Sequence, residues 1–580
     1  MTIAPPRESI AKASPAKAWM RAIERTSAIS RQPGRILPSI IDEVAARTPG
    51  ASALLSGRES FTYAELSARS NRYANWAVQN QARTVALLMP NRPEYLAIWL
   101  GVTKTGVVAA LLNTNLSGAS LAHTINVAGA DHVIVAPELL GQLDVTALKS
   151  NPKIWLHGQD FEIEDYSAEP PSARGVTVND QALYIYTSGT TGLPKAALVS
   201  HARILQWSLW FAGMLDASPQ DRMYNCLPLY HSVGGVLAPG AILAAGGSMV
   251  TREKFSASQF WNEVIGWDCT LVQYIGELCR YLLQQPGNAT GHKVRIACGN
   301  GLRPDVWEQF QNRFAIPRIL EFYASTEGGV SLFNAEGKVG SIGRVPPYLT
   351  HRFAPALIQF DTEKNEPVRG ENGFCLPAET NLPGEAIGAV SSNAGTRFEG
   401  YTDPAATSGK ILRNVFKPGD TWIRTGDLMK KDKEGFFYFV DRVGDTYRWK
   451  GENVATLEVA EAICEFGRVK EANVYGVALP HADGRAGMTL LVPEPGFDLA
   501  EFRTHLASRL PKYARPVFLR IRDSVDLTGT FKYVKSDLIR AGFDPSATSD
   551  SLYVDHPGQQ TFVPLSPELY ASIQAGEIRF

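Results

Sequence analysis

The chain has 580 residues and a formal net charge of −1, with 44% hydrophobic and 20% charged residues. This length predicts two or more domains with cores of their own, and the near-zero net charge excludes a global attraction to nucleic acid. Six cysteines are scattered without a C-x-x-C pair, which fits a reducing cytosol and argues against a disulfide framework or a zinc site.

Residues 1–35 form a basic N-terminal arm. Its charged residues are Arg7, Lys12, Lys17, Arg21, Arg25, Arg31 and Arg35, against Glu8 and Glu24. Such a helix can rest on anionic lipid, but a solvated helix is the preferred interpretation. The arm lacks the apolar stretch of a secretory signal. Residues 95–112 contain a lysine, threonines and glycines, so they predict a packed helix leading into a strand rather than a membrane span.

Short apolar strands then alternate with longer helical stretches, such as residues 93–104 and 256–265. The strands are expected at residues 85–89, 132–135, 183–186, 270–274, 294–297 and 319–322. This alternation predicts an α/β fold, in which a large domain over residues 36–443 has parallel-rich sheets covered by helices. Ligands in such folds bind at the carboxyl ends of the strands.

One strand end carries the most informative string of the chain. After the apolar run 182–185 come Thr187, Ser188, Gly189, Thr190, Thr191, Gly192, Leu193, Pro194 and Lys195. Glycines allow a close approach of the backbone, while hydroxyls and a lysine supply donors for anionic oxygens. The pattern predicts a phosphate-binding loop, although its spacing is not that of a P-loop. A flexible surface loop is the alternative.

The pattern of predicted strands and helices changes near residue 435. A dense strand at 436–440 is followed by the break 441–445, a helix at 456–465 and strands at 473–478 and 488–492. A further helix has an apolar face, formed by Leu499, Phe502, Leu506 and Leu510. We expect a small C-terminal α+β domain over residues 444–580, with a hinge near Gly444 and Asp445, since glycine absorbs a large backbone change at little cost.

The string 187–195 resembles the phosphate loop of the adenylate-forming superfamily, which includes acyl-CoA synthetases, adenylation domains and luciferases. Further motifs stand in the family's order at residues 228–232, 299–303, 323–328, 425–428 and 527–532. The resemblance covers most of residues 55–580. It implies the family's fold: a large domain that includes a small β-barrel-like part, and a small mobile C-terminal domain.

The resemblance implies a role for each motif. His231 would border the carboxylate-binding pocket, and Gly299 and Gly301 would lie along one face of adenine. Tyr323 would stack on adenine, Thr326 would meet the α-phosphate, and Glu327 would hold Mg²⁺, since a hard cation prefers carboxylate oxygen. Asp427 would accept both ribose hydroxyls, with Arg442 also reaching the ribose. These roles imply ATP and Mg²⁺.

Lys532 would be the catalytic lysine, although Phe531 stands where the family more often has glycine. Residues 441–453, 528–532 and 552–580 resemble the very-long-chain acyl-CoA synthetase and fatty-acid transport protein branch. In that branch Gly451, Glu452 and Asn453 would border the pantetheine path of coenzyme A.

The expected function is therefore ligation of a long- or very-long-chain fatty acid to coenzyme A, through acyl-AMP. Alternatives are an acyl-AMP ligase that loads a carrier protein, and a peripheral membrane protein that takes up fatty acid by thioester trapping. We expect a cytoplasmic location with an option of peripheral membrane contact, no nucleic-acid partner, and a homodimer as one option for assembly. Acyl length and acceptance of bile acids stay open.

The acyl pocket has the least direct support. A helix after the phosphate loop carries Trp207, Trp210, Phe211 and Met214, and residues 234–247 are small and apolar. Small residues leave room for an acyl channel, in which each buried methylene contributes about 0.8 kcal/mol. Close packing of a helix on a sheet explains the same residues equally well.

Overall fold

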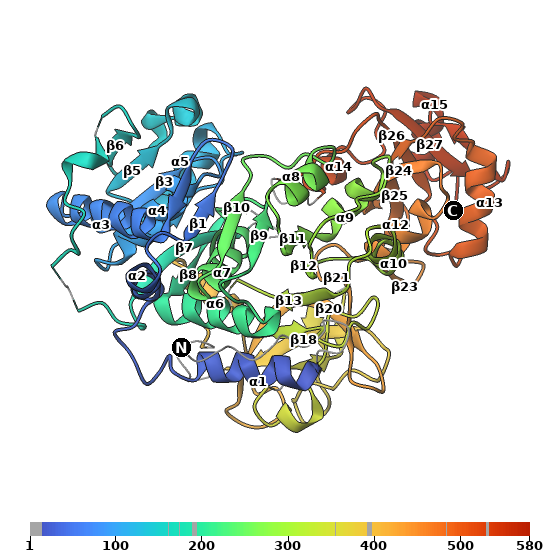
Figure 1. Cartoon of the computed structure of the whole chain (residues 1–580). Coiled ribbons are helices and arrows are strands. Elements are labelled where there is room, and N and C mark those ends of the chain that lie inside the picture. The colour runs from blue at the N-terminus through green and yellow to red at the C-terminus, as the bar shows by residue number, and fades with distance from the viewer. Residues whose placement is uncertain are drawn as a thin grey trace.

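The computed structural model describes residues 14–160, 162–172, 175–187, 194–326, 328–353, 355–362, 364–390, 397–482, 484–528 and 533–580. A large part with three main sheets is followed by a smaller C-terminal part, drawn in orange and red beside α9 and α10 in Figure 1. The fold is α/β with mixed sheets and helices, as expected for an adenylate-forming enzyme.

The first sheet has six strands in the order β6-β5-β3-β4-β7-β8, parallel except for β8. Its strands are β3 Thr84–Leu88, β4 Val108–Leu111, β5 His132–Val135, β6 Lys153–Leu156, β7 Gln181–Thr187 and β8 Lys195–Ser200. The associated helices are α3 Tyr63–Gln79, α4 Pro93–Thr103 and α5 Gly118–Ala128. Helix α4 is buried on all sides, which explains its lack of a polar face. Among the described residues no helix is long and apolar enough to cross a membrane.

The second sheet has eight strands in the order β14-β13-β12-β11-β9-β10-β1-β2, and only its edge strands β2 and β14 pair antiparallel. The strands are β1 Ser52–Leu55, β2 Ser60–Thr62, β9 Arg222–Asn225, β10 Ser248–Thr251, β11 Leu271–Ile275, β12 Ile296–Asn300, β13 Ile319–Ala324 and β14 Ser331–Phe333. Its helices are α2 Leu37–Arg47, α6 His201–Leu215, α7 Ala238–Ala244, α8 Phe260–Gly266, α9 Gly276–Leu283 and α10 Pro304–Arg313. The predicted parallel strands are confirmed, with ends that differ by a few residues.

The third sheet is antiparallel, in the order β15-β18-β20-β19, and β21 also pairs with β20. It consists of β15 Ala356–Ile358, β18 Gly384–Ala389, β19 Ile411–Arg413, β20 Thr421–Lys431 and β21 Phe437–Arg442. Beside it lie the two-residue strands β16 Phe360–Asp361 and β17 Glu366–Pro367 and the short helix α11 Pro404–Gly409. This antiparallel sheet is the part of the large domain that we compare with the expected small barrel-like part.

The C-terminal part begins with a hairpin of β22 Tyr447–Trp449 and β23 Glu452–Val454 and has a five-stranded sheet, β24-β25-β26-β27-β28. The sheet strands are β24 Val469–Ala478, β25 Arg485–Pro493, β26 Phe518–Ile521, β27 Ser551–His556 and β28 Thr561–Pro564. The helices are α12 Thr456–Cys464, α13 Leu499–Arg509, α14 Ser536–Ala541 and α15 Pro567–Gln574. Its buried apolar residues form a cluster of their own, which runs from Tyr447 to Ile573.

Helix α1 Pro15–Thr26 is not the solvated helix that the charge pattern suggested, because its apolar face is buried against α6. The Trp19 ring lies 5.6 Å from that of Trp210 and 6.0 Å from that of Phe333. Arg21 and Arg25 donate hydrogen bonds to the carbonyls of Gly213 and Ala217. The basic side chains thus satisfy carbonyls at the carboxyl end of α6, where cations are favourable.

The small apolar segment that was an acyl-channel candidate is closely packed. It forms a π-helical turn, Val233–Leu237, that continues into α7. A Cβ at Gly235 would lie 1.7 Å from the Leu229 carbonyl oxygen, and one at Gly240 would lie 2.0 Å from Ser208 Oγ. At these positions glycine permits close approach, so close packing accounts for them better than a channel does.

Gly235→Ala should therefore destabilise the large part, because the added methyl group overlaps backbone that cannot yield. We expect a loss of about 1–3 kcal/mol in the free energy of unfolding, measured as a shift of the denaturation midpoint. Gly57→Ala is the matched control, since a Cβ at Gly57 meets nothing within 4 Å. Equal midpoints for the two variants would contradict the packing argument.

Candidate functional site

Two segments that sequence analysis singled out meet beside the eight-stranded sheet. One follows β9 and contains Ser232; the other follows β13 and contains Thr326. Their hydroxyl oxygens lie 3.4 Å apart. Because parallel strands point their carboxyl ends to one edge of the sheet, residues 94 positions apart in sequence can share this place. The predicted neighbours His231 and Tyr323 belong to the same two segments.

Tyr323 and Asp427 come from different sheets and are directly bonded. The Tyr323 hydroxyl donates to Asp427 Oδ2 at 2.5 Å. Asp427 pairs with Arg442 across β20 and β21, so three of the predicted nucleotide-binding residues lie together. Each is half-buried, with part of its side chain accessible to a ligand. The result is an aromatic face, a carboxylate and a guanidinium at one position.

Local irregularities fix the direction of Asp427. The pairing register shifts between Glu385 and Ile387 on β18, and again between Leu428 and Met429 on β20. Such bulges re-aim side chains at sheet edges. The Asp427 backbone N–H also donates to Thr425 Oγ1 at 3.1 Å.

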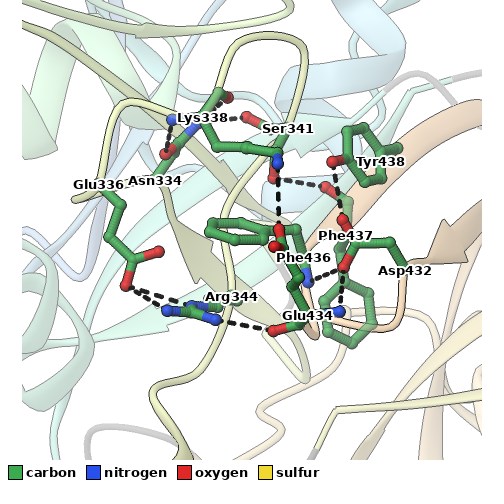
Figure 2. Close-up of polar contacts among 10 residues, drawn as sticks. All are labelled: Asn334, Glu336, Lys338, Ser341, Arg344, Asp432, Glu434, Phe436, Phe437 and Tyr438. Atoms are coloured by element: carbon green, nitrogen blue, oxygen red, sulfur yellow. Dashed lines mark hydrogen bonds and ion pairs between the residues drawn. The ribbon is translucent and has the colours of Figure 1, made fainter.

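A set of contacts, here called the sheet anchor, ties residues 334–344 to residues 432–438, which include the turn between β20 and β21 and the start of β21 (Figure 2). Arg344 donates to Glu336 and to the Glu434 carbonyl oxygen, and its guanidinium lies 4.4 Å from the Phe436 ring centre. Ser341 Oγ donates to the Phe437 carbonyl oxygen at 2.9 Å. Since residue 334 directly follows β14, which pairs with β13, the anchor holds the strand of Asp427 to the strand of Tyr323.

His231 lies two residues before the π-helical turn. Its carbonyl oxygen accepts a hydrogen bond from the Gly235 N–H, and its ring lies 4.5 Å from that of Tyr230. Tyr230 is in turn bonded to Asn115 Nδ2 at 2.9 Å. Irregular π turns are frequent at functional sites. The segment is therefore held in a defined conformation beside Ser232 and Thr326.

Gly299 and Gly301 occupy places where a side chain would not fit or would be strained. A Cβ at Gly299 would lie 2.2 Å from the Tyr274 carbonyl oxygen, and Gly301 has a φ of +78°. The start of α9 lies against this loop: a Cβ at Gly276 would lie 1.7 Å from the Gly301 carbonyl oxygen. The loop thus presents bare backbone, and its predicted place along adenine stays a prediction. Gly276 and Tyr274 belong to no recognised motif, so their part in this loop was not predicted.

Only the ends of the predicted phosphate loop are described. Thr187 and Lys195 face each other as an antiparallel pair at the ends of β7 and β8. Seven candidate residues, which include the proposed metal ligand and the catalytic lysine, lie outside the described part of the chain. They are Ser188, Gly189, Thr190, Thr191, Gly192, Glu327 and Lys532. Their roles stay predictions.

Gly451, Glu452 and Asn453 lie in the exposed hairpin of the C-terminal part. Lys450 and Gly451 form its turn, both in the left-handed region with φ of 54° and 84°, which suits a two-residue hairpin loop. Asn453 Oδ1 accepts a hydrogen bond from Thr362 Oγ1 of the large part at 2.5 Å. The hairpin therefore lies within reach of the large part in this arrangement.

An ionic contact joins the two parts beside α9. Arg280 donates to the Lys470 carbonyl oxygen at 2.6 Å and lies 3.4 Å from Glu471 Oε1, while Glu277 binds the same guanidinium. Tyr533, the neighbour of candidate Lys532, lies near these charges. Burial and the nearby Glu277 carboxylate raise the pKa of Tyr533 well above its ordinary value.

A second contact crosses the expected hinge. Asp441 Oδ2, at the end of β21, accepts hydrogen bonds from the N–H and the hydroxyl of Thr456 at 2.5 and 2.9 Å. Lys535 Nζ donates to Thr456 Oγ1 at 2.9 Å and lies 3.5 Å from Asp445 Oδ2. The start of α12, the hinge segment and the chain that follows residue 532 are therefore tied together. The hinge role of Gly444 stays a prediction.

The described ranges contain no group of three or more His, Cys, Asp or Glu residues arranged to hold a metal ion.

Comparisons with known proteins show the family of this chain. Residues 41–373 match the AMP-binding enzyme family, and residues 458–532 match the AMP-binding enzyme C-terminal domain. The chain is 40% identical to long-chain fatty acid transport protein 6 of Mus musculus, over 94% of this chain and 91% of that protein. It is 42% identical to long-chain fatty acid transport protein 3 of Homo sapiens, over 86% of this chain and 75% of the relative.

Solved structures share the fold at lower identity. ATP-bound MatB from Rhodopseudomonas palustris matches with a TM-score of 0.74 and 23% identity, over 88% of this chain and 99% of that one. The O-succinylbenzoate coenzyme A synthetase MenE of Bacillus subtilis, in complex with AMP, matches with a TM-score of 0.71 and 23% identity, over 87% and 97%.

Asp427→Asn should weaken binding of AMP, because the substitution removes the charge that strengthens hydrogen bonds from ligand hydroxyls. We expect a rise of about tenfold or more in Kd by titration calorimetry, since hydrogen bonds to charged groups contribute about 1.5–3 kcal/mol. Glu371→Gln makes the same change of charge on an exposed residue of the large part. An unchanged Kd for Asp427→Asn would remove Asp427 from the site.

Proposed function

Because the chain belongs to the AMP-binding enzyme family, in the branch of the long-chain fatty acid transport proteins, we propose that it is an ATP-dependent fatty acid:CoA ligase. The observation that carries this proposal is the meeting of Tyr323, Asp427 and Arg442 from two sheets, next to the hydroxyls of Ser232 and Thr326. These groups provide an aromatic face, charged groups and hydroxyls at one place, which a nucleotide and a carboxylate can bind.

The proposed contacts with the nucleotide follow from the positions of the site residues. Tyr323 offers a flat face to adenine, and its hydroxyl keeps Asp427 turned toward the same place. An ionised Asp427 accepts two ribose hydroxyls at once, and Arg442 on the neighbouring strand lies beside it. We assign Thr326 to the α-phosphate and residues 187–195 to the outer phosphates.

The first step must bring two anions together. A carboxylate oxygen of the fatty acid attacks the α-phosphorus of ATP, the bond from that phosphorus to the bridging oxygen breaks, and pyrophosphate leaves. We assign the cationic stabilisation of this step to Lys532 and Lys195. Holding both reactants in line contributes on the order of 7–11 kcal/mol. In the second step the CoA thiolate attacks the carbonyl carbon and AMP leaves.

Mg²⁺ is proposed as the cofactor, with Glu327 as its protein ligand. Glu327 follows Thr326, whose hydroxyl lies 3.4 Å from that of Ser232, so its chain neighbours supply oxygen donors of the kind that a hard cation accepts. When bound, the ion would neutralise charge on the phosphate oxygens.

The proposed turn of the C-terminal part gives the hairpin of Gly451, Glu452 and Asn453 its role. Once Lys532 has withdrawn, the hairpin would border the pantetheine arm of coenzyme A. That turn has to separate Arg280 from Glu471, which lie 3.4 Å apart here. The two half-reactions would then use two arrangements of the same two parts.

The acyl half is supported mainly by the names of the relatives, which are called long-chain fatty acid transport proteins. His231, Ser232 and Thr326 mark where the carboxylate would lie, next to the nucleotide residues. The glycines at 235 and 240 leave no room themselves, so an acyl chain would have to pass elsewhere. A long or very long chain is the proposed substrate.

The same names favour a second candidate function, uptake of fatty acid at the cytoplasmic face of a membrane through peripheral contact. Conversion to the thioester would trap the acid, so uptake would depend on the ligase reaction.

An acid panel tests the reaction. Purified protein with ATP, Mg²⁺ and CoA is given acids from acetate through very long chains, together with cholate, and acyl-CoA and AMP are measured. We expect one AMP per acyl-CoA and the highest kcat/KM with long or very long chains. Pyrophosphate release without acyl-CoA from every acid would point to a carrier protein as acceptor instead.

Lys532→Ala should separate the two half-reactions. Acyl-AMP formation should fall by about 10²-fold or more, because a cation that stabilises the transition state is removed. Conversion of preformed acyl-AMP to acyl-CoA should stay within about threefold. Lys512→Ala, which removes an exposed lysine of the same part, is the control. Equal losses in both half-reactions, with the fold intact, would contradict the assignment of Lys532 to acyl-AMP formation.

A further inference from the structure

A buried carboxyl group contacts the loop that is assigned to adenine. Glu321 is 1% exposed and precedes Tyr323 by two residues on β13, so both side chains point to the same face of the sheet. Its Oε1 accepts a hydrogen bond from the Leu302 N–H at 3.0 Å, and its Oε2 accepts one from the Tyr274 hydroxyl at 2.5 Å. No step of the proposed reaction uses this group.

Strand register explains how the contact forms. Tyr274 on β11, Gly299 on β12 and Glu321 on β13 stand in one cross-strand row. The Tyr274 ring crosses Gly299, where a Cβ would lie 2.5 Å from Cδ2 and 2.7 Å from Cε2 of that ring. The missing side chain at position 299 therefore allows Tyr274 to reach Glu321.

The same carboxyl group fixes the loop after β12. Through Leu302 it holds the chain that turns at Gly301, and the start of α9 closes on the other side of that turn. This loop and Tyr323 would form the walls on either side of adenine. Burial raises the pKa of Glu321 to about 8, although the bonds from Tyr274 and Leu302 lower it. A glutamine, which is neutral and of the same shape, is therefore a conservative replacement.

We propose that Glu321 is a positioning residue for the adenine ring: with Tyr274 it holds the 299–302 loop at the spacing from Tyr323 that a purine needs. Glu321 does not touch the fatty acid or the phosphates and acts only through the loop. This inference rests on the proposed nucleotide site and adds to it the residue that sets its affinity for the base.

The chain contains a matched control. Tyr73 and Glu94 form a second buried pair in which a tyrosine hydroxyl donates to a glutamate, and Glu94 is 2% exposed. That pair joins α3 to α4 beside the six-stranded sheet. Tyr73→Phe therefore removes a buried tyrosine hydroxyl that donates to a glutamate, as Tyr274→Phe does, away from the nucleotide residues.

The test compares Glu321→Leu, Glu321→Gln and Tyr274→Phe in the full chain, with Tyr73→Phe as the control. Kd for AMP is measured by calorimetry, and KM for ATP, for GTP and for the acid, with kcat, in the ligase assay. For Glu321→Leu we expect Kd for AMP and KM for ATP to rise about tenfold, as for one lost hydrogen bond to a buried group. The acid KM and kcat at saturating ATP should stay within about twofold.

Two further results are expected: Glu321→Gln within about threefold of wild type, and a reduced preference for ATP over GTP in Glu321→Leu. An unchanged Kd for AMP, or equal rises in the KM values for ATP and acid, would overturn the proposal. If Glu321→Leu does not fold, Tyr274→Phe decides by the same criteria, with an expected rise of about threefold or more. AMP binding is measured without turnover, so absence of ligase activity would refute the proposed function while this comparison still stands.

Discussion

Two sheets have to meet at a fixed distance for this site to exist. Tyr323 belongs to β13 of the eight-stranded sheet and Asp427 to β20 of the antiparallel sheet, and one 2.5 Å hydrogen bond joins them. A single such bond contributes only about 0.5–3 kcal/mol, so it reports the alignment of the sheets rather than creating it. The sheet anchor at 334–344 and 432–438 supplies the alignment, with backbone bonds between Ile342, Gly343 and Phe437 as well as the ionic contacts of Arg344.

The second constraint on the site is that several positions must be glycine, so that backbone is left uncovered there. Gly299 lets a tyrosine ring cross a strand, Gly301 turns in the left-handed region, and Gly276 brings a helix start against that turn. Each of these glycines lacks a side chain that would push a neighbouring residue out of place. Polar groups of Tyr274 and Glu321 then occupy the space so created. The surface offered to a ligand depends on packing one layer beneath it.

Sequence patterns predicted much of this arrangement, for reasons that can be stated. The parallel strands are short apolar runs between helices, and the nucleotide candidates belong to motifs that keep their order along the chain. Glu321 and Tyr274 belong to no motif; only strand register, which depends on pairing between distant segments, brings them together. The prediction for helix α1 was wrong because it considered only the charged residues. Ala18, Trp19 and Ala22 have the helical spacing of a buried apolar face. Small residues at 234–247 were ambiguous, since close packing and an open channel both use them.

Helix α9 connects the nucleotide loop to the C-terminal part. Its first residue, Gly276, packs on Gly301, and one turn later Arg280 reaches Glu471 across the interface. Separating two buried charges is usually costly, because the one left behind lacks a partner. Here Glu277 lies on the same helix and stays with Arg280 whichever way the C-terminal part turns. The partner that leaves is Glu471. Burial raises the pKa of Glu471 in this arrangement, and its carboxylate regains water when the two parts separate. The interface can therefore be buried and still reversible, which is what two successive half-reactions on one site require.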